Sequence, residues 1–407
     1  MRIRMVIVCF WITTVTSKTN ENTRTLINDI FTNYSSKVRP VINQRDPLSL
    51  DVSFYLSSIN EVDEVKGKLV TTGCLSLTWT DELLRWTPAD YNGTDIIFIP
   101  QNDIWKPDLV LKNGFKKFEE LGGSFYYLSV FHDGTVAWLP FNVFESRCSM
   151  DITYFPFDKQ TCDIKFLTWS HYIDQIDIQR SSDGIQFYEY EVNGVWDLID
   201  TSSEIHREQK KSQIKFTLTL RRKPLYYVMN IILPVVFLGY LNILVFVIPV
   251  DTGEKMSFSV TVFLSFAVFL TIISTLLPTS SENTPIIAIY LIIQLVYGVK
   301  ALIISAFQLR LNHRHEAEEI PMFWIKVVQL QSKLRCKSTQ IDTVDMYLNK
   351  EEENSVKKID EDSPDVIIGW NHVASSIDFL AFWYFMFTNI FITVVVFSVL
   401  ATPSHKA

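Results

Sequence analysis

The chain has 407 residues with a formal net charge of −8, and 48% of its residues are hydrophobic. The apolar residues are unevenly distributed, which excludes a chain that is soluble throughout. The sequence shows no nucleophile–base set, phosphate-binding loop or metal-ligand cluster, so we predict no enzyme, cofactor, metal site or nucleic-acid partner.

The first 17 residues predict a secretory signal peptide. Arg2 and Arg4 precede an apolar core from Met5 to Val15, and small polar residues follow. The alternative is a membrane anchor, but this core is too short to cross about 30 Å of hydrocarbon. We therefore expect the mature chain to begin outside the cell.

Residues 18–223 predict an extracellular domain. Apolar residues recur at helical spacing over 25–36, which indicates a short amphipathic helix. Apolar and polar residues then alternate, as in strands, over 50–57, 74–79 and 215–220. Short strands separated by turn residues predict an antiparallel β-sandwich behind the helix.

Five cysteines divide between compartments. Cys9 leaves with the signal peptide and Cys336 falls in a predicted cytoplasmic segment, so one pair and one odd thiol remain outside. Cys148 and Cys162 close a loop of about fifteen residues, worth about 3 kcal/mol in the chain-entropy model. Alternation places the odd thiol, Cys74, on a polar strand face, either as a small residue in a subunit contact or as a reactive site.

Four apolar stretches predict membrane-spanning helices, because each approaches or exceeds the ~20 residues that such a helix needs. They are Leu225–Val250, Phe258–Leu277, Pro285–Leu309 and Ile377–Ala401. Lys and Arg gather after Leu309 and are absent between Pro278 and Pro285, so both termini are expected outside. The predicted segments are transmembrane helices 1–3 (224–311), a cytoplasmic segment (312–368), a pre-helix with the fourth span (369–401) and an extracellular tail (402–407).

Other features fit this topology. Asn33 and Asn92 begin glycosylation sequons on the predicted outer side. Lys300 lies toward the cytoplasmic end of the third span, where we expect it to reach the membrane surface, with a buried functional charge as the alternative. In the cytoplasmic segment, Ile320–Leu334 predicts an amphipathic helix, and the acidic run Glu351–Asp365 predicts partial disorder.

The second span carries hydroxyl groups on one helical stripe. At steps of three and four residues, the stripe collects Ser257, Thr261, Leu264, Val268, Thr271 and Thr275. One interpretation is a polar seam between helices. The other is a water-filled pore, favoured by the charged flanks Asp251, Glu254, Lys255 and Glu282.

A single stripe cannot enclose a channel, so the pore interpretation requires several subunits around one axis. A ring of Glu254 carboxylates would attract cations and repel anions, and rings of Leu264 and Val268 would stop ions by dewetting. We therefore predict a channel in membrane lipid that passes monovalent or divalent cations.

Several motifs point to one family. They are Trp105-Lys106-Pro107-Asp108, the Cys148–Cys162 loop with Phe-Pro-Phe-Asp at its tip, Arg-Arg-Lys-Pro at 221–224, Pro234, and Asp-Thr-Gly-Glu-Lys at 251–255. In these the chain resembles the Cys-loop pentameric ligand-gated ion channels, and specifically subunits of the nicotinic acetylcholine receptor type. The resemblance covers nearly the whole mature chain except the cytoplasmic segment.

The resemblance implies an α+β membrane protein of the plasma membrane, at a synapse, in which four further subunits, identical or different, complete a pentamer. It implies a small ligand bound at extracellular subunit interfaces. It also implies that Gly253-Glu254-Lys255 is the cation-selective variant of its motif.

An aromatic ligand box is implied as well, and this sequence matches it only in part. Trp169 matches the box tryptophan, whose ring would hold a quaternary ammonium, although core packing is the alternative. Lys112 and Lys211 stand where tyrosines are expected. On the complementary side Cys74 replaces a tryptophan, and Leu139 is assigned to the same site. Two lysines would repel a cation by on the order of a few kcal/mol, so we do not expect simple acetylcholine as the ligand.

By the same resemblance, three segments meet at the membrane surface and couple ligand binding to the pore. They are the turn with Glu64 and Val65, the tip Phe155-Pro156-Phe157, and the linker Pro278–Pro285. Arg222 would pair with Glu64, the alternative being an ordinary surface charge. Phe155-Pro156 is a candidate for a cis peptide bond.

The leading hypothesis is therefore a subunit of a pentameric, extracellular-ligand-gated cation channel. The alternative is an auxiliary or orphan subunit that joins a heteropentamer without an agonist response of its own. A subunit that binds an anionic or neutral ligand is a further possibility.

Overall fold

The computed structural model describes residues 20–116, 121–123, 125–182, 184–250, 253–276, 284–314, 320–335 and 369–401. The predicted signal peptide, the tail at 402–407, Asp251, Glu282, Cys336, most of the 278–285 linker and the acidic run lie outside these residues. Two compact units form. The sandwich unit comprises Met1–Met150 and Lys159–Arg222, and the helical unit comprises Asp151–Asp158 and Lys223–Ala407.

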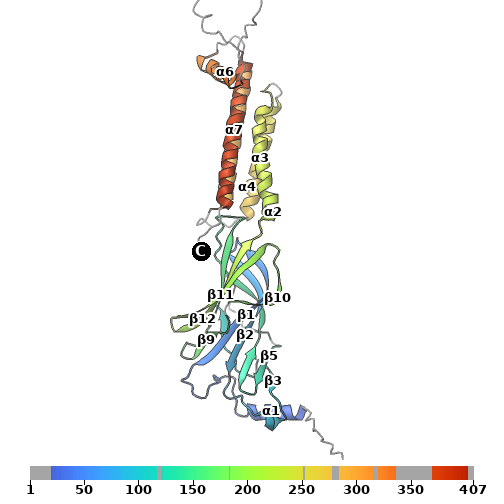
Figure 1. The fold of residues 1–407 in the computed structure, drawn as a ribbon, viewed down its shortest axis with the longest axis vertical. Coiled ribbons are helices and arrows are strands. Elements are labelled where there is room, and N and C mark those ends of the chain that lie inside the picture. The colour runs from blue at the N-terminus through green and yellow to red at the C-terminus, as the bar shows by residue number, and fades with distance from the viewer. Residues whose placement is uncertain are drawn as a thin grey trace, which may run out of the picture. The chain divides into compact units, whose positions relative to one another are not determined.

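The sandwich unit begins with helix α1 (Asn20–Phe31) and continues with twelve strands (Figure 1). The strands are β1 (Leu48–Asp63), β2 (Lys68–Thr80), β3 (Ile96–Pro100), β4 (Leu109–Leu111), β5 (Tyr127–Phe131), β6 (Thr135–Trp138), β7 (Phe141–Arg147), β8 (Lys159–Thr168), β9 (Ile176–Arg180), β10 (Gln186–Glu191), β11 (Trp196–Glu208) and β12 (Lys211–Arg222), with the short 3-10 helix η1 (Pro88–Tyr91) before β3. Helix α1 lies earlier than the predicted 25–36. It ends at Phe31 because Asn33 adopts a φ of 66°, which a right-handed helix does not contain.

The strands form two sheets. The first has the order β10-β1-β2-β6-β5-β3, with β7 also paired to β2 and β9 to β1; the second has the order β11-β12-β8-β4. Most ladders are antiparallel, as predicted, but β1 pairs in parallel with β9 and β10. The chain reaches these parallel positions only after passing through β8 of the other sheet, because parallel neighbours need a crossover connection.

One core fills the sandwich. The predicted inward face of β1, Leu50, Val52, Phe54 and Leu56, is fully buried. Rings from both sheets meet there: the Phe54 ring lies 5.5 Å from that of Phe144 and 5.6 Å from that of Phe216, centroid to centroid. Burying each ring stabilises the fold by about 1.5–3 kcal/mol, so period-two alternation decides which face of each strand turns inward.

The helical unit contains four helical segments long and apolar enough to cross a membrane among the residues described: Leu225–Val247, Glu254–Thr275, Ile286–Asn312 and Trp370–Ala401. Their elements are α2 (Leu225–Tyr227), the π-helical turn η2 (Val228–Ile232), α3 (Leu233–Leu244), η3 (Val245–Val247), α4 (Glu254–Leu276), α5 (Ile286–Asn312) and α7 (Trp370–Ala401). Figure 1 shows the long ribbon of α7 beside that of α3, with α4 partly hidden behind α3. The predicted amphipathic helix is α6 (Met322–Leu334).

Irregularities in these helices have identifiable causes. The wide turn η2 ends two residues before Pro234, which lacks the N–H that a regular α-helical turn would use. Gly253 has a φ of 67°, a conformation that favours glycine, and α4 begins at the next residue. Helix α7 starts at Trp370, before the predicted Ile377, because the pre-helix and the fourth span form one continuous helix.

Polar side chains join the helices inside the unit. Asn389 on α7 donates from Nδ2 to Gln294 Oε1 on α5 at 3.2 Å, and the hydroxyls of Tyr290 and Thr393 lie 3.1 Å apart. A Cβ on Gly239 of α3 would lie 3.0 Å from Asn389 Nδ2. Gly239 therefore lets α3 approach a hydrogen-bonded α5–α7 seam of the kind that stabilises membrane helices.

Candidate functional site

The predicted pore stripe lies on one exposed face of α4. All six stripe residues and Glu254 are exposed in the single subunit, with Leu264 60% and Val268 49% exposed. The opposite face is buried: Lys255, Ser259, Val262, Phe266 and Ile273 are each at most 4% exposed. At about 100° per residue the buried set clusters around one direction and the stripe lies about 180° away from it. Helix α4 therefore has a packed face and a free face, and the hydroxyls lie on the free one.

The stripe hydroxyls make local hydrogen bonds. Thr261 Oγ1 donates to the Ser257 carbonyl at 2.9 Å, and Thr271 and Thr275 donate to carbonyls three residues earlier at 2.7 Å each. These bonds satisfy the hydroxyl protons within an apolar helix.

Lys255 does not belong to a water-facing flank, so that interpretation of the sequence was wrong for this residue. Its ammonium points into the helical unit and forms an ion pair with Asp378 Oδ1 of α7, with side chains only 4% and 13% exposed. Gln308 Nε2 of α5 donates to the same carboxylate oxygen at 2.9 Å. The pair thus joins α4, α5 and α7 beside Glu254, because a buried charge requires a partner.

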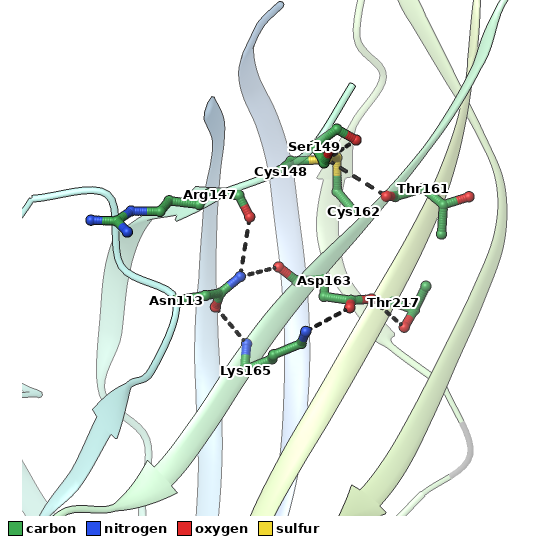
Figure 2. The surroundings of a disulfide bond; sticks show 9 residues. All are labelled: Asn113, Arg147, Cys148, Ser149, Thr161, Cys162, Asp163, Lys165 and Thr217. Carbon is green, nitrogen blue, oxygen red and sulfur yellow. Dashed lines mark hydrogen bonds and ion pairs between the residues drawn. A yellow bond between two sulfur atoms is a disulfide. The ribbon is translucent and has the colours of Figure 1, made fainter. Parts of the chain in front are cut away.

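The predicted disulfide between Cys148 and Cys162 is present, with an S–S distance of 2.00 Å and Cα atoms 5.2 Å apart. Asn113 braces the strands that carry it (Figure 2). Its Nδ2 donates to the carbonyl oxygens of Arg147 at 3.2 Å and Asp163 at 2.8 Å, and its Oδ1 accepts the N–H of Lys165 at 3.0 Å. One side chain therefore ties the end of β7 to β8.

The tip of the disulfide loop packs within the helical unit. Phe155 is 4% exposed, and its ring centroid lies 4.9 Å from that of Tyr227 in α2. The carbonyl of Thr153 accepts the N–H of Ile286, the first residue of α5, at 3.0 Å. The Phe155-Pro156 bond is cis, as predicted, and Phe157 is 39% exposed. The loop is therefore anchored in the sandwich by its disulfide, while its tip is part of the helical core.

Glu64 and Arg222 form the expected pair. Arg222 Nη1 lies 2.6 Å from Glu64 Oε1, and the Arg222 side chain is 1% exposed. The guanidinium also lies 4.2 Å from the centroid of the Trp196 ring. The alternative of an ordinary surface charge is therefore wrong for Arg222. Val65, which follows Glu64 in the sequence, is 48% exposed. A role of this pair in gating stays a prediction.

Three of the predicted ligand residues lie at one end of the second sheet. Trp169 follows β8 and is 57% exposed, and Lys211 begins β12. Lys211 Nζ donates to the Trp169 carbonyl at 2.6 Å. Lys112 follows β4, and its Nζ donates to Gln213 Oε1 at 2.7 Å.

The other two predicted ligand residues belong elsewhere. Cys74 lies in β2 of the first sheet, opposite Tyr55 and Phe141 on the neighbouring strands, and Leu139 follows β6 and is 49% exposed. Cys74 was expected on the polar face of its strand, but it is a buried free thiol, 8% exposed, and burial raises its pKa to about 11. One subunit therefore does not bring Trp169 and Cys74 together, and only a site shared between two subunits would contain both.

The remaining sequence features occupy surface positions. Asn33 is exposed and Asn92 partly exposed. Lys300 is exposed on α5, with Nζ 5.6 Å from the centroid of the Tyr297 ring. Lys300 is therefore not a buried charge.

Known proteins show what this arrangement is similar to. The model of the neurotransmitter-gated ion-channel ligand binding domain matches residues 23–224, and that of the neurotransmitter-gated ion-channel transmembrane region matches residues 231–359. The neuronal acetylcholine receptor subunit beta-3 of Homo sapiens is 35% identical over 344 residues, which cover 82% of this chain and 74% of that subunit. The chain belongs to the neurotransmitter-gated ion-channel family.

Other relatives in this family match less completely. The neuronal acetylcholine receptor subunit alpha-6 of Mus musculus is 32% identical over 77% of this chain and 64% of that subunit. The alpha-3 subunit of Carassius auratus is 33% identical over 75% of this chain and 61% of that subunit. The chain thus spans less than two thirds of the length of these two alpha subunits.

Membership of the neurotransmitter-gated ion-channel family confirms the predicted fold class and the predicted similarity to nicotinic receptor subunits. It makes the chain a subunit of a ligand-gated channel, a multi-pass protein of the plasma membrane and not an enzyme. Pentameric assembly is typical of the family.

Sequence reasoning missed two residues that organise the site. Asn113 gave no signal, because an asparagine before a glycine usually marks only a turn. Asp378 did give one, since an acidic residue inside a membrane-spanning helix is expensive and calls for a named partner.

Proposed function

We propose that this chain is a subunit of a pentameric channel that an extracellular ligand opens, that α4 lines the pore, and that the pore selects cations. The single observation that carries this proposal is the two-faced burial of α4. Its apolar face, with Lys255, is covered by the subunit's own helices, while its hydroxyl stripe is left exposed together with Glu254. An exposed hydroxyl stripe on a membrane-spanning helix is accounted for when it faces water.

Selectivity would arise at Glu254. Five carboxylates around one axis create a negative potential that concentrates cations and repels anions. Lys255, the adjacent cation, does not cancel this charge, because its ammonium is turned away and paired with Asp378. Above this level Leu264 and Val268 would form the apolar rings that close the pore by dewetting.

Coupling would run through two features. The loop tip at Phe155 is part of the helical core, and the buried Glu64–Arg222 pair fixes the end of β12 immediately before the chain enters the helical unit.

Both termini would lie outside the cell, and the assembled channel would act postsynaptically.

A second candidate is an auxiliary subunit that joins a heteropentamer without an agonist response of its own. The observation that favours it is the state of the two lysines at the ligand face. Lys211 and Lys112 are both hydrogen-bonded within the subunit, so neither ammonium is poised to receive an anionic ligand. The relatives named above are acetylcholine receptor subunits, and acetylcholine would then bind at the faces of partner subunits.

Ion-substitution recordings test the cation pore. The chain is expressed alone and with acetylcholine receptor subunits, and a panel of ligands is applied. Glu254→Ala should move the reversal potential of the evoked current toward that of chloride, whereas Glu189→Ala, a change in the sandwich unit, should leave it in place. A reversal potential that Glu254→Ala does not move would refute the carboxylate ring. A ligand-evoked current from the chain alone would exclude the purely auxiliary role.

A further inference from the structure

The ammonium group of Lys211 is held in the manner of a bound ligand. Its Nζ donates to two backbone carbonyls, that of Trp169 at 2.6 Å and that of His171 at 2.9 Å. It also lies 4.6 Å from the centroid of the Tyr172 ring. Carbonyl oxygens and an aromatic face are the groups with which proteins bind ammonium ions.

The turn that supplies these acceptors is fixed independently of Lys211. Asp108 accepts the N–H of Ser170 through one carboxylate oxygen and lies 2.8 Å from His171 Nδ1 through the other. The Trp169 N–H donates to the Asp108 carbonyl at 3.1 Å, and the Thr168 hydroxyl donates to the His171 carbonyl at 3.1 Å. The carbonyls of Trp169 and His171 are therefore preorganised as an acceptor pair.

We propose that Lys211 is a tethered occupant of this subunit's own ammonium site and excludes amine ligands by occupying it. This inference rests on the proposed function, in which Trp169 belongs to the ligand face. The sequence alone predicts only repulsion between lysines and a cationic ligand. The contacts show a different mechanism, because the cation is already docked on the acceptors that a ligand would need.

Tethering makes the exclusion effective. A group attached to the same chain competes at an effective concentration that reaches about the millimolar range for short flexible links, and the Lys211 side chain is shorter and more restricted than such a link. Lys112 contributes less to this exclusion, since its ammonium is held 2.7 Å from Gln213 Oε1.

The geometry also predicts which ligands the emptied site would prefer. Without the Lys211 ammonium, the acceptors left behind are two carbonyl oxygens and one ring face. A primary ammonium such as ethylammonium donates to both carbonyls and contacts the ring. Tetramethylammonium has no N–H and can use only the ring.

Binding to the purified full-length chain tests this proposal. Thermal stabilisation by ethylammonium chloride is measured against sodium chloride at equal ionic strength, because a ligand that binds only the folded state raises its stability. Lys211→Ala should bind ethylammonium at least tenfold more tightly than the wild type, and more tightly than tetramethylammonium. Lys211→Met, which keeps the aliphatic stem, replaces the alanine variant if that variant is unstable, and should show a smaller gain.

Two further lysines are compared. Lys210→Ala, next in sequence and exposed, is the control and should retain the wild-type response, and Lys112→Ala should gain much less than Lys211→Ala. An equal gain in Lys112→Ala would show that repulsion rather than occupancy excludes amines, and a folded Lys211→Ala variant without any gain would overturn the proposal. The readout needs no current, so its failure is distinguishable from a failure of the pore proposal, which the Glu254 recordings report separately.

Discussion

Breaking the Lys255–Asp378 pair should destabilise the helical unit strongly. Asp378→Asn removes the charge that compensates an ammonium with a 4% exposed side chain. Removing one member of a buried ion pair costs about 3–5 kcal/mol, because the remaining charge stays buried without a partner. Replacing both members, as in Lys255→Met with Asp378→Leu, removes the unpaired charge and should recover most of this loss.

Unfolding of the full-length chain in an SDS titration, followed by pulse proteolysis, measures these differences. The double-mutant cycle of Lys255→Met, Asp378→Leu and their combination should give a coupling energy of at least about 2 kcal/mol, well above the ~0.5 kcal/mol within which independent sites add. Additive effects of the two single changes would refute the assignment of the pair as a buried, mutually dependent interaction.

The same pair should also set the rotation of α4. Val268→Cys and Phe266→Cys form a matched test in a background without Cys74 and Cys336, since Val268 is 49% and Phe266 only 1% exposed. A water-soluble thiol reagent should modify the cysteine at 268 much faster than the one at 266. With Asp378→Asn the difference should shrink, because the contact that orients the buried face is lost. An unchanged ratio in that background would show that apolar packing alone orients the helix.

Two further predictions concern the sandwich unit. Glu64→Arg and Arg222→Glu should each impair gating, because each places two like charges side by side where the Arg222 side chain is only 1% exposed. The double exchange should restore part of the response. Equal losses in all three variants would count against the pair. Burial raises the pKa of Asp81 from 3.8 to about 6, so the folded state favours the protonated acid. Stability should therefore increase as pH falls from 7 toward 4, by up to about 3 kcal/mol. The Asp81→Asn variant should lose this part of the pH dependence of the melting temperature. A pH profile identical to that of the wild type would contradict this role of Asp81.

Periodicity along the chain accounts for what could be predicted. The inward face of β1 and the exposed stripe of α4 both follow from residue spacing alone, since a strand repeats every two residues and a helix every 3.6. The cis bond at Phe155-Pro156 could be anticipated from its two residues. Each of these features depends only on residues that are close together in the sequence, so the sequence is sufficient to predict it.

Features that depend on distant partners could not be predicted in this way. Lys255 looks like a charged flank until Asp378, 123 positions away, is brought beside it. Cys74 alternates as a polar-face residue, yet it is buried in β2 between neighbouring strands that carry Tyr55 and Phe141. The parallel placement of β9 and β10 depends likewise on the route of the chain through the second sheet.

The hydrogen bonds of the α4 threonines have a consequence for the ions themselves. The hydroxyls of Thr261, Thr271 and Thr275 donate their protons to carbonyls of their own helix. Toward the proposed pore these hydroxyls therefore present the lone pairs of their oxygens and no donor. At these three positions a passing cation would find substitutes for part of its hydration shell, and a chloride ion would find no hydroxyl donor. The lining would thus discriminate by hydration along its length, in addition to the barrier that Glu254 sets by charge at one end.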